Sequence, residues 1–82
     1  MEFTIEMLKK YNMLSLEGYK EMFGDNQDTE LEFYRTFLIQ TDHIPNKIIE
    51  AQILGKSADD YTEVLNLRKI ARLKINELTA TI

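Results

Sequence analysis

The sequence has 82 residues, no cysteine, one histidine and a formal net charge of −4. A chain this short forms one domain with a thin core, since it buries only about 60–65% of the surface that its unfolded form exposes. The absence of cysteine excludes disulfides, thiolate zinc sites and cysteine nucleophiles. The acidic balance, with a sequence pI of 4.9, argues against general attraction to nucleic-acid phosphates.

The first 24 residues predict two short helices. Thr4 is the predicted N-cap of the first, which should end near Tyr11 or Asn12. The segment "SLEGYKEMFG" predicts the second, with Ser15 as N-cap and Gly24 supplying the left-handed residue that ends it. The polar loop "DNQD" follows.

A stronger helix signal comes at "TELEFYRTFLIQ". Thr29 and Glu32 have the spacing of a capping box directly ahead of an apolar run. The apolar residues of this run share one helical face, which predicts that the helix packs by that face. They are Leu31, Tyr34, Phe37 and Leu38.

The stretch "QTDHIPNKIIEA" predicts a joint between two helices. A proline inside a helix costs about 3 kcal/mol, but in the first turn its missing N–H would have no partner anyway. With Asp42 as N-cap, Pro45 falls in a first turn, so the preceding helix should end or kink near Thr41. His43 is then a solvated first-turn residue.

A hairpin is predicted for the rest of the chain. The helix from the joint should run to Leu54, with Gly55 closing it, and Ser57 should cap the last helix, with Asp60 at the capping-box position. The last helix, "ADDYTEVLNLRKIARLKINEL", should be the longest. A short turn makes the two helices antiparallel neighbours. The predicted fold is therefore all-α: a single domain over residues 1–82, a small helical bundle whose core is this C-terminal antiparallel hairpin, covered by the earlier helices.

The two hairpin helices carry more apolar residues than one packing face needs. In the last helix the core face consists of Val64, Leu67, Ala71, Ile75 and Leu78. The surplus residues lie off the core faces of the two helices, and they are the candidate interaction residues: Ile49, Ile53, Leu65, Ile70 and Leu73. Two interpretations have about equal weight, namely burial on two sides of a compact bundle, or self-association as a dimer or higher oligomer.

The sequence offers little chemistry. Asp42 and His43 are adjacent without forming a dyad, and the motifs of phosphate loops and serine elbows are absent. We therefore predict no catalytic, cofactor-binding or metal site. Arg68 and Arg72 share a helix face and could contact an anion or a partner's carboxylates, but the favoured interpretation is that they pack along the core edge and pair with acids nearby.

Neither a secretory leader nor a membrane span is predicted. The start "MEFTIEMLKKYNML" lacks a basic leader and an apolar signal core, and no apolar run approaches the roughly 18 residues that span a bilayer. We expect a cytosolic protein, or one assembled from the cytosol, without membrane contact.

Residues 33–78 carry a pattern in which "FL" and "TD" precede "KI" and "EA", a short turn, and a helix ending in "INEL". This pattern resembles small phage and prophage proteins encoded among tail and other structural genes. The matching positions are Phe37, Leu38, Thr41, Asp42, Lys47, Ile48, Glu50, Ala51, Tyr61, Val64, Arg68, Ala71, Arg72, Ile75, Asn76, Glu77 and Leu78. The resemblance implies an accessory or structural phage protein that works by association.

The expected function is therefore a non-enzymatic phage or prophage protein acting through protein–protein association, in the cytoplasm of the bacterial host or associated with the virion. Its expected partners are further copies of itself and phage structural proteins. The alternative is a small regulatory binding module that contacts a host protein or nucleic acid through the basic helix face.

Overall fold

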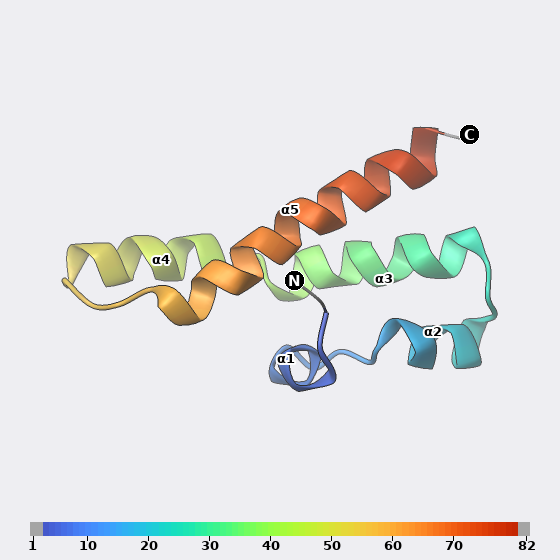
Figure 1. The fold of residues 1–82 in the computed structure, drawn as a ribbon, viewed down its shortest axis with the longest axis horizontal. Coiled ribbons are helices and arrows are strands. Elements are labelled where there is room, and N and C mark those ends of the chain that lie inside the picture. The colour runs from blue at the N-terminus through green and yellow to red at the C-terminus, as the bar shows by residue number, and fades with distance from the viewer. Residues whose placement is uncertain (1–2, 81–82) are drawn as a thin grey trace.

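The computed structural model describes residues 3–80, and over that range the chain is helical, with no strand (Figure 1). The all-α fold class predicted from the sequence is confirmed. The helices are α1 (Ile5–Lys10), α2 (Leu16–Phe23), α3 (Gln27–Gln40), α4 (Ile44–Ile53) and α5 (Asp59–Ala80). None of them is long and apolar enough to cross a membrane.

The α3 helix lies at the centre of an elongated molecule. Figure 1 shows α2 on one side of α3 and α5 on the other, while α4 leads on from the end of α3 and pairs with the first half of α5. The principal extents are 44 × 26 × 19 Å and the radius of gyration is 14.0 Å. A compact chain of this length has a radius of gyration of about 12 Å. The molecule is thus more extended than a compact domain of its length.

Aromatic side chains build the core on α3. Phe33 and Phe37 are fully buried, and the Phe3 ring packs edge-on against both, with centroid distances of 5.6 and 4.9 Å. The same cluster holds apolar side chains from the other helices and loops, namely Met7, Leu8, Met13, Ile44, Val64, Leu67 and Ala71. Edge-to-face ring pairs add roughly 0.5–1.5 kcal/mol each beyond the area that they bury.

The predicted C-terminal hairpin forms, but it is not the centre of the core. The α4 and α5 helices run in opposite directions (Figure 1), and the turn between them is a Schellman motif, in which Lys56 N donates to Ala51 O (2.8 Å) and Gly55 N to Gln52 O (3.2 Å). Gly55 has a φ of 69°, as this motif requires. However, α5 packs more extensively on α3 than on α4. The prediction of a hairpin core is therefore wrong, because the largest buried side chains belong to α3.

Two helix starts agree with the sequence. Thr4 Oγ1 accepts from Met7 N (3.2 Å) and Ser15 Oγ from Gly18 N (3.1 Å), as N-caps do. Gly24 ends α2 with a positive φ of 96°. The first helix ends at Lys10, with Tyr11 as its C-cap, close to the predicted end.

The predicted cap of α3 is wrong, and α5 begins slightly later than predicted. The N-cap of α3 is Asn26, whose Oδ1 accepts from Thr29 N at 2.9 Å, so Thr29 lies inside the first turn rather than ahead of it. Thr29 is buried and its hydroxyl donates to the same Asn26 oxygen. The α5 helix begins at Asp59, one residue later than predicted, and Ser57 Oγ accepts from Asp59 N (3.3 Å), the second amide after it, as a capping side chain can.

The joint between α3 and α4 lies where the sequence predicts it, but the predicted N-cap of α4 is wrong. Pro45 stands in the first turn of α4, and α3 ends with Thr41 as C-cap. The N-cap position of α4 belongs to His43, which makes no capping side-chain hydrogen bond, so the Asp42 cap is wrong. Thr41 stabilises the turn instead of Asp42: its Oγ1 donates to Phe37 O (2.6 Å), and Ile44 N donates to Thr41 O (3.1 Å).

Candidate functional site

The five candidate interaction residues differ in exposure. The side chains of Ile49, Ile53 and Leu73 are 53%, 79% and 61% exposed. Leu65 is half-buried, and Ile70 packs against the core cluster. Three of the five thus lie open to solvent, and Ile70 belongs to the edge of the core.

These residues do not form one continuous patch. Arg68, midway along α5, bonds to Leu38 O and Thr41 Oγ1 at the α3–α4 joint. Residues of α5 before Arg68 therefore run alongside α4, and residues after it run alongside α3 (Figure 1). Leu73 lies on the α3 side of the joint, whereas Ile53 lies at the far end of α4.

The outer face of α4 is the clearest apolar surface. Ile49 and Ile53 are four residues apart, so they are neighbours on one side of the helix. Ile44 and Ala51 are buried on the opposite side. Leu54, directly after the helix, is also exposed, at 63%. We call Ile49, Ile53 and Leu54 the α4 strip; sequence analysis found its isoleucines and missed Leu54, which it treated only as a helix end.

The two candidate arginines have different environments. Arg68 is only 7% exposed, and its Nη1 donates to Leu38 O (2.7 Å) and Thr41 Oγ1 (2.6 Å). Desolvation lowers the pKa of Arg68, as does the nearby charge of Arg72, while Asp42 raises it. Arg72 is exposed. The guanidinium of Arg68 thus binds the C-terminal end of α3, where a cation also complements the helix dipole. The side chain of Arg72 remains accessible to solvent.

The joint also carries the single histidine of the sequence. Asp42 and His43 are exposed, and the His43 ring lies 6.1 Å from that of Tyr11. Among residues 3–80, no group of three His, Cys, Asp or Glu side chains could hold a metal ion.

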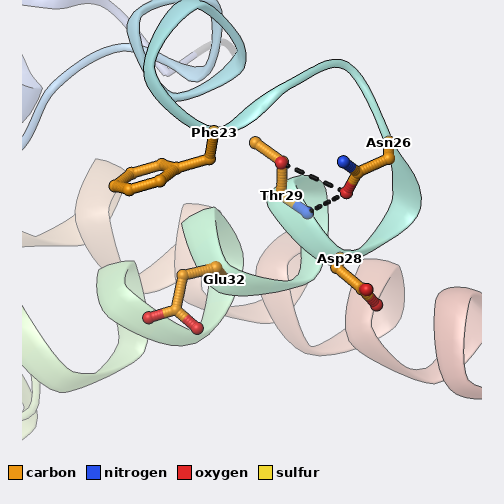
Figure 2. A pocket seen from close by; sticks show the side chains of 5 residues that line it. All are labelled: Phe23, Asn26, Asp28, Thr29 and Glu32. Carbon is orange, nitrogen blue, oxygen red and sulfur yellow. Dashed lines mark hydrogen bonds between the residues drawn. The ribbon is translucent and has the colours of Figure 1, made fainter.

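A hollow of about 410 Å³ opens at the corner between α2 and α3, and sequence analysis did not anticipate it. It is lined by Phe23, Asn26, Asp28, Thr29 and Glu32 (Figure 2). Figure 2 shows the Phe23 ring and the Glu32 carboxylate projecting to the same side of the corner, while Asn26 bonds to Thr29. Phe23 is 59% exposed although it is aromatic. The hollow thus combines an accessible aromatic ring with acidic side chains.

The surroundings of this hollow are strongly acidic. Residues 17–32 contain six carboxylates and a single basic residue, Lys20. Lys20 lies near Asp25 (3.5 Å) and Glu30 (3.9 Å). Within the described part of the chain, Asp28 and Glu32 have no ion-pair partner. A missed signal was available in the sequence, because Met22 and Phe23 stand together amid these acids.

Comparison of the chain with models of protein families, with curated proteins and with solved structures finds no match.

Proposed function

We propose that this protein is a non-enzymatic accessory or structural protein of a phage or prophage that acts through protein–protein association. Its setting would be the cytoplasm of the bacterial host or the virion, and its partners further copies of itself or phage structural proteins. The phage setting rests on the resemblance over residues 33–78, which is a pattern of packing residues without chemistry.

The α4 strip carries the proposal of association. Ile49 and Ile53 expose most of their side chains on a helix whose other face is already buried against α5. Burying one such side chain contributes about 1.5–3 kcal/mol. Two isoleucines and Leu54 from each of two copies would therefore support a symmetric dimer, which is the commonest closed assembly.

The shape of the molecule supports the same proposal. An elongated chain with a radius of gyration of 14.0 Å has less core per residue than a compact one. A second copy laid along α4 would supply apolar contacts that the single chain lacks.

The alternative is a small regulatory module that contacts a host protein or nucleic acid through the basic face of α5. One observation favours it: Lys69 and Arg72 are exposed and have no ion-pair partner within residues 3–80. Against it stands Arg68, which is buried and bonded within the chain and offers no free guanidinium to a phosphate.

A charge placed in the α4 strip tests the proposal. Ile53→Glu puts a carboxylate at the centre of the contact and should turn the dimer into a folded monomer in sedimentation velocity. Gln52→Glu is the matched control, because it adds the same charge to the same exposed turn, beside the strip. Circular dichroism should show helical content unchanged in both variants. Equal sedimentation of Ile53→Glu and the wild type at all concentrations would exclude the α4 strip as the interface.

A further inference from the structure

The outer face of α5 is a counterpart to the acidic hollow. Arg72 and Leu73 lie three and four residues after Lys69, and all three are exposed, so their side chains share one side of the helix. We call them the basic strip. Val64, Leu67 and Ala71, which are buried in the core, occupy the other side of α5. Leu73 thus stands exposed beside two cations, as Phe23 stands exposed beside two carboxylates.

Within the part of the chain that the structure describes, the charges on both surfaces have no ion-pair partner. Among residues 3–80 the other α5 base of this region, Lys74, pairs with Glu77 at 3.7 Å, whereas Lys69 and Arg72 pair with no acid. Asp28 and Glu32 at the hollow likewise pair with no base. The hollow therefore offers two free carboxylates four residues apart, and the basic strip offers two free cations three residues apart, so the spacings are similar.

The two surfaces cannot meet within one molecule. The α3 helix lies between α2, which carries Phe23, and α5, which carries the basic strip (Figure 1). The hollow and the basic strip consequently face different directions, and a contact between them requires two copies.

We propose that the hollow between α2 and α3 receives the basic strip of a second copy, with Leu73 against Phe23 and Arg72 against Glu32. This inference rests on the proposed function of association, and it adds a second contact to the dimer formed by the α4 strip. In this contact one copy uses its hollow and keeps a free basic strip, while the other uses its basic strip and keeps a free hollow. The contact is therefore head-to-tail and extends the assembly beyond two copies.

The two contacts should differ in their dependence on salt concentration. Exposed ion pairs are screened, with a Debye length of about 30 Å at about 0.01 M salt and about 3 Å at about 1 M. The wild type should grow beyond a dimer at low salt and return to the dimer at high salt, because burial of the α4 strip depends little on screening.

Charge reversal tests the contact directly by sedimentation velocity at low salt. Glu32→Lys makes the hollow basic and Arg72→Glu makes the strip acidic, so each variant alone should stop at the dimer, with the second contact weakened about fivefold or more. An equimolar mixture of the two variants should grow again, because each reversed surface then meets its complement. Glu63→Lys is the control, since it reverses an exposed acid of α5 that lines a different hollow, against α1, and it should assemble as the wild type does.

The failures are distinguishable. A wild type that stops at two copies at low salt, or single reversals that assemble as the wild type does, would overturn the head-to-tail contact and leave the proposed function standing. A mixture that fails to recover would overturn it too. A wild type that is monomeric at every salt and protein concentration would overturn the proposed self-association and this inference together.

Discussion

The residue that holds the helix joint is Arg68. Its buried guanidinium donates to Leu38 O and to Thr41 Oγ1, and Thr41 in turn donates to Phe37 O, so one chain of hydrogen bonds ties α5 to the last turn of α3. Its Nε is buried without a partner within the described chain, which makes the remaining bonds more important. The sequence located the joint through Pro45. It assigned the cap to Asp42, whereas His43 takes the N-cap position without a capping bond and the Thr41 side chain bonds instead to Arg68 of α5, a tertiary contact that local spacing does not reveal.

This network predicts an order of mutational costs. Thr41→Val keeps the side-chain volume but removes the hydroxyl, leaving Nη1 of Arg68 with one acceptor fewer, and should lower the free energy of unfolding by about 1–3 kcal/mol. Asp42→Ala and His43→Ala should change it by about 0.5 kcal/mol or less, because both residues are exposed and neither caps the helix. Urea denaturation followed by circular dichroism measures all three. A larger loss for Asp42→Ala than for Thr41→Val would contradict the network.

At the scale of elements, the sequence predicted the existence of the helices better than their starts. The segment "DNQDTE" holds several residues able to cap a helix. Asn26 takes the role because α3 begins early: Gln27 Nε2 donates to Leu78 O near the end of α5, and Thr29 is buried. Both are tertiary contacts that local spacing does not reveal. The α2–α3 hollow depends on the same corner, which is why it was not predicted.

The start of α3 gives a second stability test. Asn26→Ala removes the side-chain acceptor from Thr29 N and should lower the free energy of unfolding by about 0.5–2 kcal/mol. Glu32→Gln should be close to neutral, because Glu32 lies in the second turn and closes no capping box. Thermal unfolding of the two variants side by side provides the comparison. A costly Glu32→Gln with a silent Asn26→Ala would restore Thr29 as the cap.

For the whole molecule, the apolar stripes of the sequence indicated that α5 packs but not on which helix. Val64, Leu67 and Ala71 fit a partner on either side, and a short turn favoured α4. The aromatic side chains of α3 instead form the centre, and α5 has 22 residues against 10 in α4, so most of it extends beyond the hairpin. Part of the apolar surplus is explained by this arrangement, since Ile70 packs against the core. Ile49, Ile53 and Leu73 remain exposed, and they are the reason to expect association.

Sedimentation equilibrium of the wild-type chain over a wide concentration range tests the central claim most directly, because it yields the mass without a label or a partner. The chain has a mass of 9.7 kDa. We expect a weight-average mass that rises with concentration to at least that of two chains at high salt, and beyond it at low salt. A mass that stays at one chain at the highest concentration and in every salt would contradict it, and the exposed isoleucines of α4 would then need another explanation.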